Sequence, residues 1–86
     1  MARQIVQARL AACVQVQAIK SFYVWETQPC EEREWLLLIK SRTTAYAALE
    51  SFIKHHHRYE TPEVVQLPIT AGSADYLRWL ALHTEG

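Results

Sequence analysis

The stretch that decides the fold is residues 14–39, VQVQAIKSFYVWETQPCEEREWLLLI. It starts with alternating apolar and polar residues, then becomes apolar or aromatic on both faces at residues 22–25 and again at 35–39. Residues 26–32, between these two runs, hold acidic side chains and a proline, a composition typical of a turn. The pattern therefore predicts a long antiparallel β-hairpin.

This hairpin has an unusual surface. The two strands, expected over residues 14–25 and 34–41, should alternate apolar with polar side chains if one layer of helices covered one face. Their aromatic and aliphatic runs do not alternate, and burying each large apolar side chain is worth about 1.5–3 kcal/mol. We expect other subunits to cover the second face. The alternative is a hairpin that folds back on its own domain.

The other elements follow from periodicity and from cap and breaker residues. In order, the sequence predicts a helix over residues 2–10, a helix over 45–55 with an N-cap at Thr43 or Thr44, a strand over 63–69, a turn and cap at Gly72 and Ser73, and a helix running to about Leu82 with Asp75 in its first turn. His56 continues the buried stripe of the second helix, and Tyr76, Leu77 and Leu80 form the inward face of the last one. The fold class is α+β with an antiparallel sheet.

Composition limits the function classes. The 86 residues suit one domain spanning 1–86, and nine basic against nine acidic side chains give zero net charge. No Lys/Arg stripe indicates nucleic acid, and no apolar run of about 18 residues indicates a membrane span. The expected compartment is the cytoplasm. Cys13, expected to be buried, and Cys30, expected to be exposed, form no CxxC motif, and a disulfide between them has little support.

Residues 55–63, HHHRYETPE, concentrate the groups that can bind a metal or move a proton. Imidazoles and carboxylates suit Cu(II), Zn(II) or Ni(II). Consecutive helical residues point about 100° apart, so His56 and His57 can bind one ion only if the helix has ended. The alternative is a structural pair, with His56 a core histidine bonded to a backbone carbonyl and His57 at the helix C-terminus. Glu60 and Glu63 suit ion pairs as well as they suit metal binding.

Several strings in order along the chain resemble one family. They are RLAACV at 9–14, FYVW at 22–25, WLLLIK at 35–40, HRYETPE at 57–63, and LPI at 67–69 followed by Gly72, Tyr76, Leu77 and Trp79. Together they are similar to the CutA divalent-cation tolerance proteins, over nearly the whole chain. The resemblance implies a ferredoxin-like sheet with helices on one face, a homotrimer joined through sheet edges, and a cytoplasmic role in tolerance of copper and other divalent metals, without established catalysis.

The resemblance also implies copper binding at the positions of His56 and His57, together with a cysteine of a first strand. Three departures from the family pattern matter. A strand that usually precedes the first helix is missing, and because it is central to such a sheet, its absence leaves unpaired backbone groups. Either the natural protein starts earlier or a partner fills the gap. Thr27-Gln28-Pro29 replaces a turn glycine, and Arg58 replaces a proline.

The leading interpretation is a homotrimeric, cytoplasmic metal-tolerance protein that binds Cu(II) or another divalent cation at His56 and His57, uses no organic cofactor, and is not an enzyme. A ligand-responsive regulatory module with small-molecule sites between subunits is the alternative, although Gly72 and Gly86, the only glycines, leave no Gly-rich phosphate loop. Acid–base catalysis by His57, Tyr59 and Glu60 lacks a nucleophile or paired-carboxylate motif. A structural hub presenting Trp79 or Cys30 also remains open.

Overall fold

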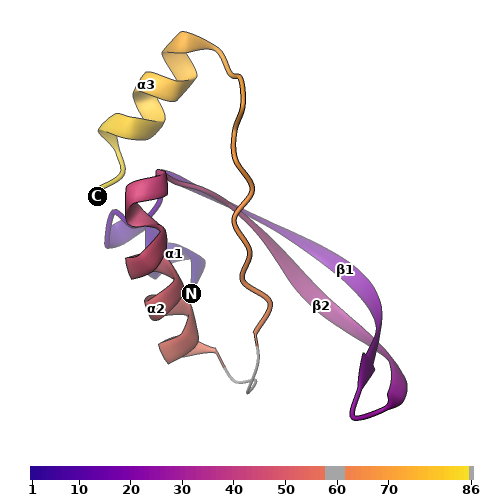
Figure 1. The fold of residues 1–86 in the computed structure, drawn as a ribbon. Coiled ribbons are helices and arrows are strands. Elements are labelled where there is room, and N and C mark those ends of the chain that lie inside the picture. Colours follow the sequence, from indigo (N-terminus) through magenta and orange to yellow (C-terminus); the bar gives the residue numbers. More distant parts are fainter. Residues whose placement is uncertain (58–61, 86) are drawn as a thin grey trace.

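The computed structural model describes residues 1–57 and 62–85. Its elements are α1 (Ala2–Gln7), β1 (Cys13–Trp25), β2 (Gln28–Lys40), a short 3-10 turn (Thr43–Ala45), α2 (Tyr46–His56) and α3 (Ala74–Leu82). Figure 1 shows α1 and α2 beside the base of the hairpin, which projects far beyond them, while a long extended segment leads up to α3. The α+β class is confirmed.

The hairpin confirms the central prediction and lengthens it. β1 and β2 pair antiparallel over thirteen residues each, from Cys13 opposite Lys40 to Trp25 opposite Gln28. The turn is therefore only two residues long, and the expected turn over 26–32 was wrong. Residues 28–32 belong to β2 because their acidic side chains find partners across the strands, as in the 2.9 Å ion pair between Glu31 and Lys20.

The hydrophobic core lies where the helices meet the base of the hairpin. Its buried residues are Ile5, Ala11, Leu49 and Ile53, and the partly buried residues packed against them are Leu10, Val14, Ile39, Phe52 and Val64. The outer half of the hairpin reaches past this core, as Figure 1 shows. One side of the hairpin base is thus covered by helices, whereas its outer half lies away from them.

α1 ends earlier than the expected Leu10 because Arg9 takes a left-handed conformation, with φ 59°. The N–H of Arg9 donates to the Val6 carbonyl, and the N–H of Leu10 donates to the Ile5 carbonyl. These are the two hydrogen bonds of a Schellman cap. The Arg9 guanidinium donates to the Leu82 carbonyl over 2.9 Å. One residue therefore both ends α1 and ties it to the end of α3.

Of the two helix caps that the sequence predicted, one is wrong and one is confirmed. No side-chain oxygen caps α2, because Thr43 and Thr44 form the 3-10 turn that precedes it, so the expected threonine cap was wrong. Ser73 does cap α3, accepting from the Tyr76 N–H over 3.3 Å, and Asp75 lies in the first turn as expected. A short polar side chain caps a helix when its own residue is extended, as Ser73 is with φ −65° and ψ 142°.

α3 buries less than expected. Leu80 is buried, but Tyr76 and Leu77, which we placed on its inward face, are exposed. The Arg9 guanidinium donates to the Leu82 carbonyl, and the Arg9 carbonyl accepts from the Glu85 N–H, so Arg9 holds the C-terminal end of α3. Periodicity predicted the helix and its apolar stripe, but not how little of the described chain lies against that stripe.

The strand expected over residues 63–69 is not formed. Residues 62–73 are extended without strand pairing, and the sheet of the described chain holds only β1 and β2. A strand exists only with a neighbour to receive its hydrogen bonds, and composition predicts the extended conformation without supplying that neighbour.

No helix in the described residues has the length and apolar character needed to cross a membrane.

The two-residue turn is strained. Glu26 and Thr27 both have positive φ, 50° and 67°. Two-residue hairpin turns of this kind favour glycine or asparagine, because a Cβ atom collides with the backbone in the left-handed region. A β-branched residue is especially unfavourable there. The thirteen-residue ladder on either side holds this turn in place.

Thr27→Gly should therefore stabilise the protein. Removing the left-handed strain is expected to add about 1 kcal/mol to the free energy of unfolding, which raises the melting temperature by about 4–8 °C in a domain of this size. Thermal unfolding followed by circular dichroism at equal protein concentration measures the shift. Thr27→Ala, which keeps a Cβ atom, should change stability by less than about 0.5 kcal/mol. A glycine variant that melts at or below the wild-type temperature would contradict the strained turn.

Candidate metal and ligand sites

The backbone removes the geometric objection to joint binding by His56 and His57. α2 ends at His56, and His57 is already extended, with φ −89° and ψ 145°. The 100° spacing of a helix therefore does not apply between the two side chains. The end of α2 thus allows both imidazoles to approach one ion, although it does not itself bring them together.

His56 is anchored through one nitrogen. Its Nδ1 lies 2.8 Å from the Phe52 carbonyl oxygen, and its ring stacks on the Phe52 ring with centroids 4.0 Å apart. A carbonyl only accepts, so Nδ1 carries a proton, and in the neutral imidazole Nε2 then keeps its lone pair. Metal-binding histidines commonly use this arrangement, in which a backbone carbonyl holds the ring and sets the tautomer.

We expected His56 to continue the buried stripe of α2, and this prediction was wrong. Leu49 and Ile53 are buried, whereas His56 is exposed. The core beneath α2 stops at Ile53, one turn before the helix ends. The carbonyl bond that we considered for a core histidine is present, but it holds an exposed ring.

The remaining sequence candidates do not gather around these histidines. Within residues 1–57 and 62–85, no group of three or more His, Cys, Asp or Glu side chains could hold a metal ion. His55 and Glu63 are exposed. Arg58, Tyr59 and Glu60 lie outside the described residues. Among the described residues, the candidate ligands are thus limited to His56 and His57.

Both cysteines are free thiols and both are half-buried. We expected Cys13 to be buried and Cys30 to be exposed, so neither environment was predicted correctly. Cys13 is the first residue of β1, opposite Lys40, at the margin of the core. Cys30 lies opposite Tyr23 in the register. The sequence analysis placed Cys30 in a turn, where it would have had no cross-strand neighbour, and therefore expected it to be exposed.

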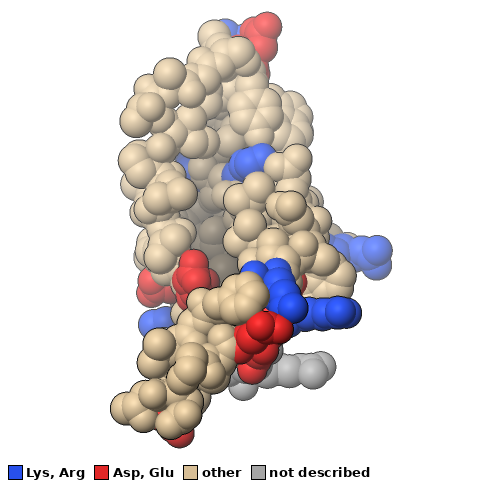
Figure 2. All heavy atoms as spheres, turned by 90° about the vertical axis from the view of Figure 1, so that its right-hand side faces the viewer, with Lys and Arg blue, Asp and Glu red and all other residues tan. Residues whose placement is uncertain are grey.

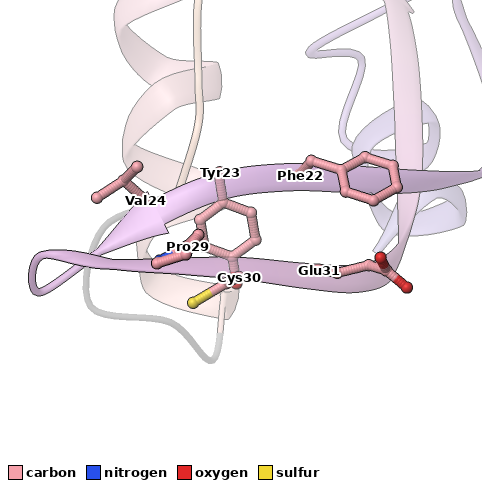
Figure 3. Close-up of a pocket in the computed structure, with 6 residues that line it drawn as sticks. All are labelled: Phe22, Tyr23, Val24, Pro29, Cys30 and Glu31. Atoms are coloured by element: carbon pink, nitrogen blue, oxygen red, sulfur yellow. The ribbon is translucent and has the colours of Figure 1, made fainter.

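A shallow hollow at the outer end of the hairpin was missed by the sequence analysis. It has a volume of about 430 Å³ and is lined by Phe22, Tyr23, Val24, Pro29, Cys30 and Glu31. Figure 3 shows these side chains coming from the two paired strands. Residues 22–24 of β1 and 29–31 of β2 meet only through the strand register. The sequence analysis placed residues 29–31 in a turn and so did not predict this contact.

Tyr23 has the most perturbed environment at this end of the hairpin. Burial of its phenol and a hydrogen bond with the Glu32 carboxylate raise the pKa of Tyr23 to about 12. Both effects penalise the phenolate, so the neutral form is favoured in the folded protein. The resulting stability is present below pH 10, the ordinary tyrosine pKa, and is lost as the pH rises from 10 to about 12.

An ultraviolet absorbance titration of the tyrosines should therefore contain a component that ionises near pH 12, and Tyr23→Phe should remove it. Glu32→Gln should lower the pKa of this component, because the carboxylate that opposes the phenolate is lost. Glu31→Gln is the matched control and should leave it in place. A high-pH component that responds equally to both glutamine variants would contradict the assigned contact.

Comparison with known proteins places the chain in a family. Residues 1–83 match the model of the CutA1 divalent ion tolerance proteins. The divalent-cation tolerance protein CutA of Thermus thermophilus is 42% identical over 85 residues, which make up 98% of this chain and 82% of that protein. The chloroplastic CutA protein of Arabidopsis thaliana is 46% identical over 81 residues, but the chain spans only 44% of its length.

Solved structures agree with the sequence match. The Cut A1 structure from Thermus thermophilus superposes with a TM-score of 0.94 at 41% identity, covering 98% of this chain and 82% of that one. The PII-like protein CutA from Nostoc sp. PCC 7120, in apo form, gives a TM-score of 0.93 at 30% identity, covering 98% and 83%. The chain therefore belongs to the CutA1 divalent ion tolerance protein family.

Proposed function

We propose that this protein is a cytoplasmic, homotrimeric divalent-cation tolerance protein that binds Cu(II) or a similar ion at His56 and His57. The observation that carries the metal site is the anchoring of the His56 ring, whose Nδ1 bonds to Phe52 while Nε2 keeps a lone pair. The relatives support the role, since the Thermus thermophilus protein is named for divalent-cation tolerance. The proposal includes no catalytic step, and the metal is cargo.

The chemistry of the two side chains suits copper. Cu(II) has the highest affinity of the divalent first-row ions for nitrogen ligands, and neutral imidazole is the form that binds it. A stacked, carbonyl-bonded His56 loses little further freedom when a metal binds. Two imidazoles supply fewer ligands than a closed metal site, so the affinity is modest and the ion exchanges readily. That behaviour suits tolerance, in which ions are bound and released.

The hairpin supports the homotrimer. The register places Leu36 and Leu38 on the face turned away from the side of β2 that carries Ile39 and packs on the core. These two leucines are 37% and 47% exposed, while Trp35 on the other face is 70% exposed. Burying such side chains is worth about 1.5–3 kcal/mol each. Contact with identical subunits would cover these side chains on both faces of the hairpin.

Copper calorimetry tests the metal site. The wild-type protein should give a saturable isotherm at neutral pH, and the variant His56→Ala/His57→Ala should weaken binding by about tenfold or more. His83→Ala is the control, because this histidine lies beside Trp79 on α3 and should not alter the isotherm. Copper isotherms that coincide for wild type and the double variant would remove the site, while leaving the family assignment intact.

Small-angle scattering at micromolar concentration tests the assembly. The scattering mass should be three times the 10.0 kDa of one chain. Leu36→Glu/Leu38→Glu should dissociate the trimer, because its two new carboxylates per protomer would place unpaired charge in an apolar interface. Gln7→Glu, on the exposed surface of α1, should leave the mass unchanged. A compact wild-type monomer with a melting transition would overturn the trimer.

A further inference from the structure

The C-terminal end of α3 is joined to the end of α1 by the polar contacts of one residue, Arg9. Its guanidinium donates to the Leu82 carbonyl over 2.9 Å, and its carbonyl accepts from the Glu85 N–H over 2.8 Å. Its Nε lies 3.8 Å from a carboxylate oxygen of Glu85. A cation beside the last carbonyls of a helix also interacts favourably with the helix dipole. We call these contacts between Arg9 and residues 82–85 the clasp.

Little else in the described part of the chain holds α3. No other helix or strand described there makes an extensive contact with it, and Leu80 is its buried residue. The ion pair between Asp75 and Arg78 lies within the helix itself. Figure 2 shows most charged side chains gathered around the hairpin, low in the molecule, whereas the upper part, where α3 lies in Figure 1, is largely uncharged. The attachment of α3 therefore depends mainly on the clasp and on Leu80.

A buried hydroxyl inside the clasp makes no hydrogen bond. Thr84 is 2% exposed, and its Oγ1 has no partner among the described residues. Burying a hydroxyl without a partner is unfavourable, and folded proteins contain few such groups. Water would satisfy this oxygen as soon as residues 82–85 moved away from Arg9. The closed clasp thus contains a local cost that opening removes.

The ion pair of the clasp is open to solvent. The Arg9 side chain is 48% exposed and that of Glu85 is 72% exposed. Dissolved salt screens a pair in such a position, and the pair adds little to the attachment at high ionic strength. The strength of the clasp therefore depends on the salt concentration.

We propose that the clasp is a salt-sensitive switch, which releases the C-terminal end of α3 from α1 while the rest of the fold stays intact. The buried cluster of Ile5, Ala11, Leu49 and Ile53 contains no residue of α3, so this end can leave without opening the core. Such local openings, with a smaller free energy than global unfolding, are common in proteins. Opening hydrates the Thr84 hydroxyl and uncovers Leu80. The switch is independent of the proposed metal site at the end of α2.

Hydrogen exchange of single backbone amides, followed by NMR on the full chain, tests the switch. The Glu85 amide reports on the clasp directly, because it donates to the Arg9 carbonyl. After correction for intrinsic rates, it should exchange at least about tenfold faster than the amides of Leu49 and Ile53 in the core. Arg9→Gln should speed its exchange by about a further tenfold, since a charge-assisted hydrogen bond is lost.

Arg3→Gln is the matched control, because it removes the same charge from the exposed surface of the same helix. It should leave the Glu85 rate within about twofold of the wild type. Thr84→Val, which keeps the shape of the side chain but has no hydroxyl, should slow the exchange by about threefold or more. Raising the NaCl concentration from about 0.05 M to about 1 M should speed the exchange about twofold in the wild type but not in Arg9→Gln.

The switch is overturned if the Glu85 amide exchanges no faster than the core amides, because only global unfolding would then release it. Equal effects of Arg9→Gln and Arg3→Gln would likewise rule it out, as would a Thr84→Val variant that exchanges at the wild-type rate. A salt effect that persists in Arg9→Gln would show that the Arg9–Glu85 pair does not control the opening.

Discussion

The pairing of β1 with β2 is the constraint on which the rest of the molecule depends. Thirteen residues on each strand are held in one register by a turn of only two residues. Because side chains alternate along a strand, this register assigns every residue of the hairpin to one face or the other. Val14 and Ile39 meet the helices, and the residues next to them face the opposite way. A shift of one residue would exchange the two sets.

This register also creates the surface that the single chain leaves uncovered. The hairpin continues well beyond the helices, and aromatic and aliphatic side chains are exposed on both of its faces. The ladder is strong enough to hold two non-glycine residues in left-handed conformations at the turn. A hairpin of this length is stable by itself only marginally. Its exposed apolar faces are the basis of the homotrimer that we propose.

The histidine site depends on a different local event, the end of α2. Because the helix stops at His56, the next residue is released into an extended conformation and the helical spacing no longer separates the two rings. Phe52, one turn earlier, then serves His56 twice, through its carbonyl and through its ring. The position at the helix end gives the ring both an anchor and access to solvent.

The sequence by itself determined the hairpin, the three helices and the serine cap of α3, because these depend on periodicity and on residues close together along the chain. Only the tertiary structure decided the two-residue turn, the early end of α1 at Arg9, the exposure of His56 and the unpaired state of residues 62–73. The physical reason is that each of these depends on a partner far away in sequence. A cross-strand carboxylate, the Leu82 carbonyl, the extent of the core beneath α2 and the presence of a neighbouring strand leave no mark on the local pattern.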